Sequence, residues 1–486
     1  MSLLFSSSSV RPSPSRQSSF PPSSLICGLL ISALVLSSRS LPAQQPLDST
    51  VALLVDLIKV NSSSPPGRTQ GLADVLAPKL RARGFEVDII PTPDSAKVHL
   101  IARLKGNGRK RPVLIAAHGD VVGVEREKWS VDPFAGIAQD GYVLGRGAID
   151  FKGGMAVFAR AAMLLAERKV KLDRDVIFLV EADEEGALPY SSEWLAKSWW
   201  PKIDAEFALN EGGWIIQRPD GSVRYVSIST ADKGTYGVIL SARGTSTHSS
   251  MPVPDNAIAA VARAVGRLAA YEWPVSLTPS TRRFFQVLGR TASADEAPAF
   301  DDVVSGDSAR VARGDAVISR DPLLHALLRT TWAPTIFNAG FRANVIPGSA
   351  EATVNVRTIP GTTPEMVLDR MRAIVADSSV KLSMAWAPGT PIPESPDTTA
   401  LFRALTAAAR ATYPGAEVTP YLFQAGTDAA AWRSRGVPVY GIYPYAISAE
   451  DLKRMHGNDE RVSIRSLQQG TEMIYRTLVE VAGSRR

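Results

Sequence analysis

Two stretches of the sequence decide the fold: residues 113–120, which read VLIAAHGD, and residues 145–154, which read GRGAIDFKGG. The apolar run 113–117 is short and is followed by glycine, which is typical of a strand buried on both faces of a mostly parallel sheet. Open α/β folds bind their ligands at the carboxyl ends of such strands. His118 and Asp120 follow this strand directly, so we expect them at a binding edge.

The second stretch predicts another polar residue at the end of a similar element. Asp150 has glycines on both sides, which allow other parts of the backbone to approach closely. An H-x-D pair alone is more often a surface turn with incidental polar residues. The candidate site therefore depends on acids and imidazoles further along the chain.

Length and composition predict a globular protein with two domains. The chain has 486 residues, of which 45% are hydrophobic and 21% charged, and this length is too great for one compact core. Strand and helix patterns alternate between residues 85 and 209, which predicts a three-layer α/β domain. The same pattern resumes near residue 391, with a helix at 399–413 and a strand at 437–442.

The intervening part predicts a smaller inserted domain. Its order of elements is typical of a ferredoxin-like βαββαβ module. The expected elements are strands at 236–242, 334–338, 350–358 and 380–386, and helices at 257–270 and 364–377. We therefore expect an α/β catalytic domain in two parts, 44–232 and 389–486, and an inserted lid or dimerisation domain at 233–388. Residues 274–333 are expected to be an insertion within that lid.

The first 43 residues resemble a secretory signal peptide. They are rich in Ser and Pro, two arginines precede an apolar segment at 25–36, and a small-residue site follows at Leu41–Ala43. This predicts a secreted or periplasmic protein. The apolar segment is shorter than the ~20 residues that span a bilayer, so no stable membrane span is expected. Anchoring by an uncleaved signal stays open as an alternative.

Cysteine and charge narrow the possible chemistry. The only cysteine, Cys27, lies in the signal segment, so the exported chain would have no disulfide, no cysteine nucleophile and no thiolate zinc site. The formal net charge of +6 falls to +3 once Arg11, Arg16 and Arg39 leave with that segment. A charge this small and dispersed does not indicate a nucleic-acid partner.

Seven acids and imidazoles are expected at strand ends or in glycine-containing loops. They are His118, Asp120, Asp150, Glu184, Glu185, Glu211 and His456. Imidazoles and carboxylates without sulfur suit zinc or a similar divalent ion. One ion would leave surplus acids repelling one another, whereas two cations about 3.5–4 Å apart, bridged by one carboxylate, neutralise the cluster. Asp150 is the natural bridge, and the Glu184–Glu185 pair offers one ligand and one general base.

The sequence gives little support for a serine hydrolase or a nucleotide-binding protein. His99 and His325 are interpreted as structural strand and helix residues. Ser246 and His248 hint at a serine hydrolase, but the sequence has no G-x-S-x-G elbow, no Walker loop and no Gly-x-Gly-x-x-Gly motif that opens a helix after a strand.

Together these residues carry a resemblance to a known family, the di-zinc metallopeptidases of family twenty. That family includes aminoacylase, glutamate carboxypeptidase, acetylornithine deacetylase and carboxypeptidase S. The similar motifs occur in the family's order and cover nearly all of the chain after the signal. They are AHGDVV, GRGAIDFKGG, EADEEG, LNEGG, GTSTHSSMP, NVIPGSAEATVNVRTIPG and MHGNDERV. The first two, with NEGG, are most similar to the carboxypeptidase S branch.

The resemblance implies a role for each metal-site residue. His118 and Glu211 would hold one zinc, Glu185 and His456 the other, and Asp150 would bridge them, with Co2+ or Mn2+ as possible substitutes. Asp120 would orient His118, and Glu184 would act as the general base for a hydroxide that bridges the metals.

The resemblance also implies substrate contacts. His248 would stabilise the oxyanion, across the interface of a homodimer formed through the lid. Asn344 and Arg357 look like the pair that grips the substrate's carboxylate, for which the arginine fork is well suited. Gly426 and Thr427 match the family's Gly-Thr-Asp loop.

Two positions depart from the family pattern, and one backbone feature is expected. Asn210 stands where relatives often have Asp, which could alter the affinity for the metal held by Glu211. Ala430 falls near a common Arg, which weakens any transfer of substrate preference. Crowding at Asp150 predicts a cis peptide bond to Phe151.

The sequence therefore predicts a zinc hydrolase that cleaves an amide bond in a peptide or N-acyl amino acid with a free carboxylate. A carboxypeptidase or dipeptidase is favoured over an N-acyl amino acid deacylase. A catalytically silent binding protein on the same fold is the alternative from a different class.

Overall fold

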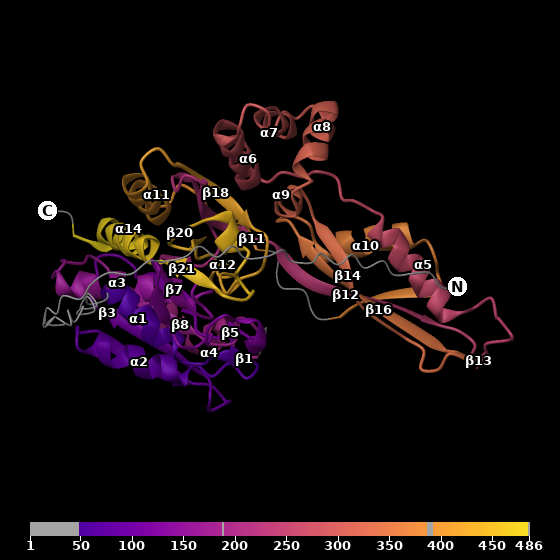
Figure 1. Ribbon diagram of the computed structural model, residues 1–486, viewed down its shortest axis with the longest axis horizontal. Helices are drawn as coiled ribbons and strands as arrows, with labels where there is room; N and C mark the ends of the chain where they lie inside the picture. The colour runs from indigo at the N-terminus through magenta and orange to yellow at the C-terminus, as the bar shows by residue number, and fades with distance from the viewer. Residues whose placement is uncertain (1–47, 187–188, 386–391, 485–486) are drawn as a thin grey trace, which may run out of the picture. The chain divides into compact units, whose positions relative to one another are not determined.

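The computed structural model describes residues 48–186, 189–385 and 392–484 (Figure 1). The expected signal peptide at 1–43 lies outside these residues. Among the helices that are described, none combines the length and the apolar character that a membrane crossing requires.

A ten-stranded sheet forms the centre of the larger domain. Four neighbouring strands run parallel in the order β8, β4, β9 and β19. Their bounds are β8 (Val176–Glu181), β4 (Val113–His118), β9 (Phe207–Asn210) and β19 (Val439–Gly441). Antiparallel strands extend one edge beside β8, namely β3 (Val98–Leu104) and β2 (Glu86–Pro91). Beyond β19 lie β11 (Val223–Asp232), β10 (Ile215–Gln217) and β20 (Ala446–Ile447), with β18 (Glu417–Phe423) pairing with β11.

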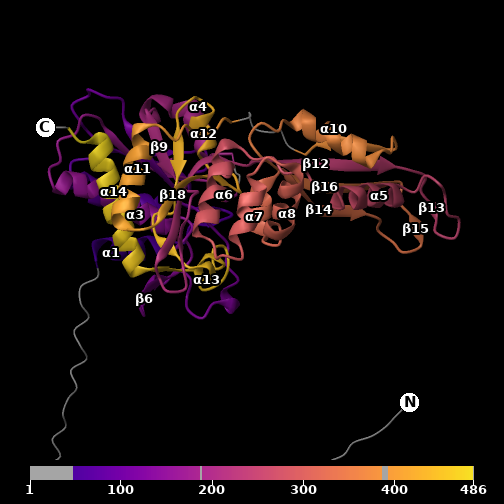
Figure 2. The same cartoon turned by 90° about the horizontal axis from the view of Figure 1, so that it is seen from above.

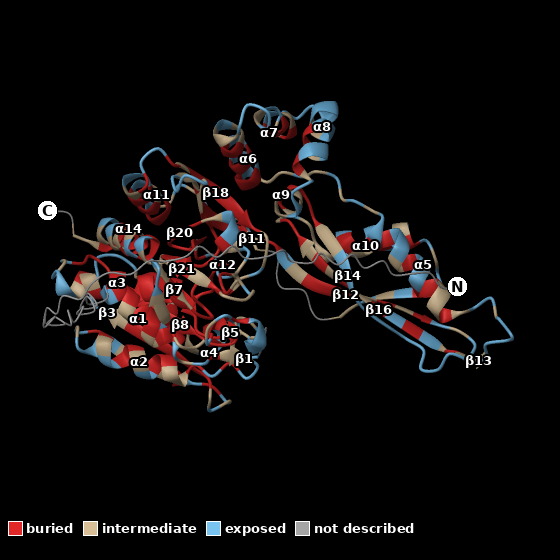
Figure 3. Cartoon of the chain, in the orientation of Figure 1, coloured by how far each residue is buried: buried red, intermediate tan, exposed pale blue. Residues whose placement is uncertain are grey.

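Side chains of the central strands alternate between two cores, because successive residues of a strand point to opposite faces of the sheet. Residues 113, 115 and 117 of β4 join one core, and residues 114 and 116 join the other. The first core includes α1 (Ser49–Ile58), α2 (Gln70–Arg81), α3 (Lys152–Glu167), α11 (Ala400–Thr412) and α14 (Ile464–Ala482). The second includes α4 (Ser192–Ile203) and α12 (Ala430–Arg433). This is the predicted three-layer arrangement, and Figure 3 shows the buried strands at its centre.

A separate four-stranded antiparallel sheet builds the smaller domain, in the order β14-β16-β12-β17. Figure 2 shows three of these strands, β12, β14 and β16, with the helices α5 and α10. Its elements follow the chain as β12 (Gly234–Arg243), α5 (Ala257–Ala269), β14 (Thr331–Ala339), β16 (Ser349–Thr358), α10 (Pro364–Val375) and β17 (Val380–Met384). Helices α5 and α10 share one apolar core with the inward side chains of the strands. The predicted ferredoxin-like βαββαβ module is confirmed, and we call it the lid module.

The expected insertion at 274–333 is helical and ends slightly earlier, because β14 already begins at Thr331. Its helices are α6 (Pro279–Thr291), α7 (Ala297–Val303), α8 (Ser308–Ile318) and α9 (Pro322–Leu328). Phe284 of α6 packs edge-on against Tyr225 of β11 and Tyr421 of β18, with ring centroids 5.6 and 5.0 Å apart. Although the insertion interrupts the lid module in sequence, α6 therefore packs on the sheet of the larger domain.

Short strands bring two distant loops together. In a three-stranded sheet of order β21-β7-β6, strand β7 (Tyr142–Leu144) pairs with both β6 (Ile137–Gln139) and β21 (Arg461–Ser463). The loop after β7 carries Asp150, and the loop before β21 carries His456. Pairing of β7 with β21 therefore places these loops side by side. The remaining short elements are β1 (Ser63–Ser64), β5 (Val121–Val122), β13 (Thr247–His248), β15 (Val345–Ile346), the 3-10 turn Arg126–Lys128 and α13 (Ala449–Leu452).

Close packing at the start of α3 requires glycine. The expected cis bond between Asp150 and Phe151 is confirmed. The Phe151 side chain is fully buried and lies over Gly154, where an added Cβ would fall 2.1 Å from its ring. At Gly153 an added Cβ would fall 2.2 Å from the Ala148 carbonyl oxygen. Both glycines thus allow α3 to begin directly beneath the Asp150 loop.

We expect Gly154→Ala to lower the free energy of unfolding by about 1–3 kcal/mol, because the buried Phe151 ring must move to admit the methyl group. Denaturant unfolding of the purified protein measures the change. Gly266→Ala is the matched control, because that position lies on the exposed side of α5 with nothing near an added Cβ. The control should be neutral or stabilising by up to about 1 kcal/mol. Equal losses of stability in the two variants would contradict the packing argument.

Candidate active site

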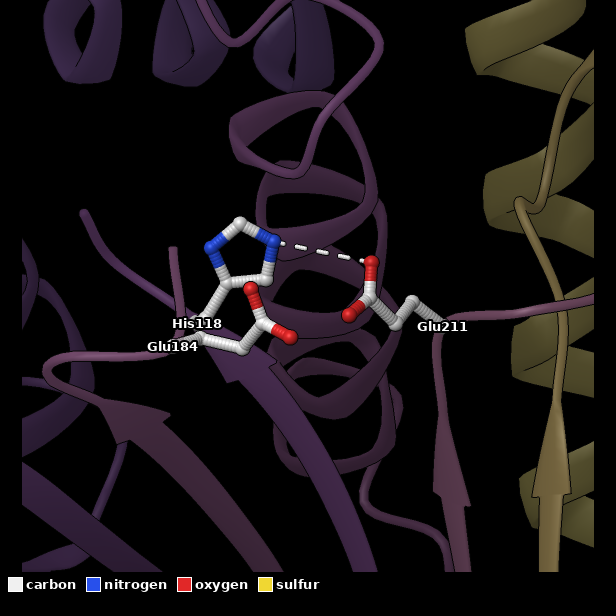
Figure 4. Close-up of side chains that lie close together, drawn as sticks. All are labelled: His118, Glu184 and Glu211. Carbon is white, nitrogen blue, oxygen red and sulfur yellow. Dashed lines mark ion pairs between the residues drawn. The ribbon is translucent and has the colours of Figure 1, made fainter. Parts of the chain in front are cut away.

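Three parallel strands place most of the candidate residues. Strand β4 lies between β8 and β9, and His118 is its last residue. Glu184 and Glu185 lie in the loop after β8, and Glu211 follows β9 directly. Because the carboxyl ends of these strands meet at one edge, His118 lies between the two sets of carboxylates. Figure 4 shows His118, Glu184 and Glu211 converging there.

The remaining two candidates arrive on loops. Asp150 was expected at the end of a strand, but it lies six residues beyond β7, in the loop that leads into α3. His456 lies in the loop between α13 and β21 and has a left-handed backbone conformation, with φ of 59°. The site thus depends on the pairing of β7 with β21 as well as on the large sheet.

Asp150 lies between the two imidazoles and offers each of them one oxygen. Its Oδ1 lies 3.0 Å from Nε2 of His118, and its Oδ2 lies 3.0 Å from Nε2 of His456. Glu211 Oε2 lies 3.5 Å from the His118 nitrogen, and Glu185 Oε1 lies 3.4 Å from the His456 nitrogen. The cluster therefore has two halves, each made of one imidazole, one glutamate and one oxygen of Asp150.

The donor set and its electrostatics fit divalent cations. Burial raises the pKa of Glu211 to about 7, with the Asp150 charge adding to the shift and His118 opposing it. Burial and then the charge of Glu211 raise the pKa of Glu184 well above its ordinary value. Glu185 Oε1 is buried without a hydrogen-bond partner among the described residues. Four carboxylates in so small a volume need positive charge, and a set of imidazole and carboxylate ligands is one that zinc accepts. Two groups of three residues could each hold an ion, because within each group the ligand atoms lie within 4.8 Å of one another. One group is His118, Glu184 and Glu211, and the other is His118, Asp150 and Glu185.

Asp120 contacts His118 and the loop that carries Glu184 and Glu185. Its backbone oxygen lies 2.9 Å from Nδ1 of His118, and its carboxylate accepts hydrogen bonds from the backbone N–H groups of Glu184 and Glu185, each at 3.1 Å. The contact that orients His118 thus comes from the backbone of Asp120. Its carboxylate instead holds the loop that carries the two glutamates.

A buried ion pair that the sequence did not predict joins the Asp150 and His456 loops. Glu460 is fully buried and pairs with Arg146 at 2.5 Å. It also accepts hydrogen bonds from the backbone N–H groups of Gly147, Ile149 and Asp150, at 2.7–3.1 Å. Arg146 in turn donates to the carbonyl oxygen of Gly457 at 2.9 Å. The signal available in the sequence was the arginine of the motif GRGAID and the final glutamate of the motif MHGNDE. Tyr443, which donates to Glu211 at 2.8 Å, was missed as well.

Three of the expected substrate-binding residues lie where the chain crosses between the two sheets. Arg357 donates to the hydroxyl of Thr235 at 2.7 Å, close to the start of β12. A Cβ added to Gly426 would lie 3.7 Å from the same hydroxyl. Thr427 donates to Asp232, the last residue of β11, at 2.7 Å. Arg357, Gly426 and Thr427 therefore form one group at the junction of β11 and β12.

The other two expected substrate residues lie elsewhere. His248 and Asn344 are exposed and adjacent, since β13 pairs with β15 and the Ser249 N–H donates to the Asn344 oxygen at 3.1 Å. The ten residues of β12 separate them from the junction by roughly 30 Å of strand. Among the described contacts, none joins His248 or Asn344 to the five candidate metal ligands, which we call the metal-ligand cluster. These are His118, Asp150, Glu185, Glu211 and His456.

Fold and site together define a hydrolase of the metallopeptidase class. A model of the Peptidase family M20/M25/M40 matches residues 114–480, so the chain belongs to this family. The chain is 32% identical over 382 residues to the N-fatty-acyl-amino acid synthase/hydrolase PM20D1 of Homo sapiens, covering 78% of this chain and 75% of that protein. It is 32% identical over 374 residues to the probable carboxypeptidase S-like 2 of Dictyostelium discoideum, covering 75% and 70%.

A solved structure shows the same fold. The M20 family metallo-carboxypeptidase Sso-CP2 from Sulfolobus solfataricus superposes with a TM-score of 0.67 at 18% identity, over 90% of this chain and 99% of that one. The predicted family and fold class are therefore confirmed.

We expect Glu460→Gln to destabilise the protein by about 3–5 kcal/mol, because it leaves the buried Arg146 charge without its partner. Chemical denaturation measures the effect. Glu450→Gln is the control, because Glu450 pairs with Arg454 at 3.1 Å on the surface, with a side chain 74% exposed. Removal of such a pair costs about 0–1 kcal/mol. Similar losses in both variants would show that the Arg146–Glu460 pair contributes no more than a surface pair.

Proposed function

We propose that this protein is an exported di-zinc amidohydrolase, secreted or periplasmic, that cleaves the amide bond of a peptide or N-acyl amino acid with a free carboxylate. One observation supports this most directly. The Asp150 carboxylate divides its two oxygens between two imidazole–glutamate halves. Such an arrangement suits a bridging ligand between two cations.

The chain's own residues supply a complete ligand set. His118, Asp150 and Glu211 would hold one ion, and His456, Asp150 and Glu185 the other. Zinc is the expected metal, with Co2+ or Mn2+ as substitutes that accept the same ligands. When bound, such a pair polarises the substrate carbonyl and lowers the pKa of the attacking water.

Glu184 is the proposed general base. Its backbone is held by the Asp120 carboxylate, and its own carboxyl group lies within the His118 and Glu211 group. A raised pKa, caused by burial and by Glu211, suits a carboxylate that must accept a proton near neutral pH. As the C–O bond forms, Glu184 takes the proton of the attacking water. It then gives this proton to the amine nitrogen as the C–N bond breaks.

Arg357 is the proposed anchor for the substrate's carboxylate. It lies with Gly426 and Thr427 at the junction of β11 and β12, and its planar guanidinium can donate two parallel hydrogen bonds. His248 and Asn344 lie far along the lid module, so the proposal includes a homodimer through this module. In that dimer they would complete the site of the partner, where His248 would stabilise the oxyanion and Asn344 would help to grip the substrate's carboxylate.

Two substrate classes fit this proposal. One relative is named an N-fatty-acyl-amino acid synthase/hydrolase and another a probable carboxypeptidase S-like protein, at equal identity. Carboxypeptidase or dipeptidase activity and N-acyl amino acid deacylation therefore both remain candidate functions. A catalytically silent protein is less favoured, because all five proposed ligands are present and converge.

We expect Glu184→Gln to bind both metals and to lose 10²–10⁴-fold in turnover, because the amide cannot accept the proton of the attacking water. Metal content per chain and the rate of amide hydrolysis measure the two effects. Glu193→Gln, at an exposed position in the first turn of α4, is the control and should keep full activity. Full turnover by Glu184→Gln would remove Glu184 from the mechanism.

A substrate comparison tests both the anchor and the class of substrate. We expect Arg357→Met to lose about 10–100-fold in kcat/KM on a substrate with a free carboxylate, since an ionic hydrogen bond contributes about 1.5–3 kcal/mol. The same variant should change little on the matching C-terminal carboxamide. Steady-state kinetics on dipeptides and on N-acetyl and N-decanoyl amino acids also decides between peptidase and deacylase. An equal loss on acid and carboxamide would contradict the role of Arg357.

A further inference from the structure

Tyr443 contacts only one half of the metal-ligand cluster. It lies two residues beyond β19 and is 1% exposed. Its hydroxyl donates to Glu211 Oε2 at 2.8 Å, with Asp150 Oδ1 as a second acceptor at 3.3 Å. A hydroxyl has one proton to donate, so the shorter bond to Glu211 is the principal one. Asp150 Oδ1 is the oxygen that faces His118, so both contacts belong to the His118 half.

The ring of Tyr443 is fixed on two sides. It stacks on Trp214, with centroids 4.1 Å apart and planes 4° from parallel, and it meets Phe151 edge-on at 5.2 Å. The Tyr443 backbone N–H also donates to the Gly213 oxygen at 2.6 Å. The hydroxyl is therefore held in place by groups that a change of Tyr443 to Phe would leave intact.

The two halves of the cluster differ in their surroundings. The His118 side chain is 1% exposed, whereas that of His456 is 48% exposed. Glu211 gains a hydrogen bond from Tyr443, whereas Glu185 Oε1 has none among the described residues. The side-chain nitrogen of Asn210, the residue expected to tune Glu211, is buried without a partner in the described part of the chain. Tyr443, and not Asn210, is therefore the neighbour outside the cluster that donates to Glu211.

We propose that Tyr443 is a positioning residue that makes the His118 half the tighter of two unequal cation sites. Its hydroxyl fixes the rotamer of Glu211 before a metal binds, so this half loses less conformational entropy on binding than the half formed by Glu185 and His456. The first divalent cation therefore binds at His118 and Glu211, and the second binds more weakly at His456 and Glu185. This inference rests on the proposed two-metal site.

Metal titration of the full-length apoprotein with Zn2+ against a competing chelator tests this inference without any measurement of activity. Wild-type protein should bind two ions in two resolved steps. Tyr443→Phe should weaken the tighter step by about 10–100-fold, as is typical when a partner of a metal ligand is lost. Tyr440→Phe is the control, because Tyr440 lies in β19, is as buried as Tyr443, and has its hydroxyl bonded to Thr399 and Pro396 instead of to the cluster. It should change neither step.

Two single-site backgrounds identify which half is affected. In His456→Ala, where the His118 half remains, Tyr443→Phe should again weaken Zn2+ binding by about 10–100-fold. In His118→Ala it should have no effect. Equal losses in both backgrounds, or no loss in either, would overturn the inference while the two-metal proposal stands. Wild-type protein that binds fewer than two ions would instead contradict the proposed function.

Discussion

Asp150 shares its carboxylate between two imidazoles, each 3.0 Å from a different oxygen, and the geometry of the site depends on this contact. The contact concentrates charge where little water can reach it, since Asp150, Glu211 and His118 are all buried. Buried carboxylates in such proximity are unfavourable unless cations or protons compensate them. That electrostatic constraint explains why imidazoles lie against the acids, and it is the physical basis for the proposed pair of divalent cations.

Much of the nearby structure holds the Asp150 loop in place. Glu460 accepts hydrogen bonds from three of its backbone N–H groups and pairs with Arg146. Below the loop, Phe151 is buried against α3, where Gly154 leaves room for its ring. A loop that is held by several hydrogen bonds keeps the Asp150 carboxylate in one orientation. A metal site requires this, because a misplaced carboxylate oxygen cannot bridge two ions.

The residues expected to bind substrate lie in two places, one at each end of β12. Arg357, Gly426 and Thr427 meet at the junction of β11 and β12, where the chain passes from the large sheet into the lid module. His248 and Asn344 lie beyond the far end of β12. Helix α6 of the insertion packs on β11 and β18, so the insertion contacts the large domain beside this junction.

The sequence by itself determined the α/β class, the inserted βαββαβ module and the residues at the ends of β4, β8 and β9. Strand periodicity and the position of a polar residue just after an apolar run are local properties, and they can be read without knowing the neighbours. Only the tertiary structure decided that Glu460 holds the Asp150 loop, that Tyr443 donates to Glu211, and that His248 lies apart from the cluster. These contacts join residues that are far apart in sequence, and they depend on strand pairing and packing that no local pattern specifies.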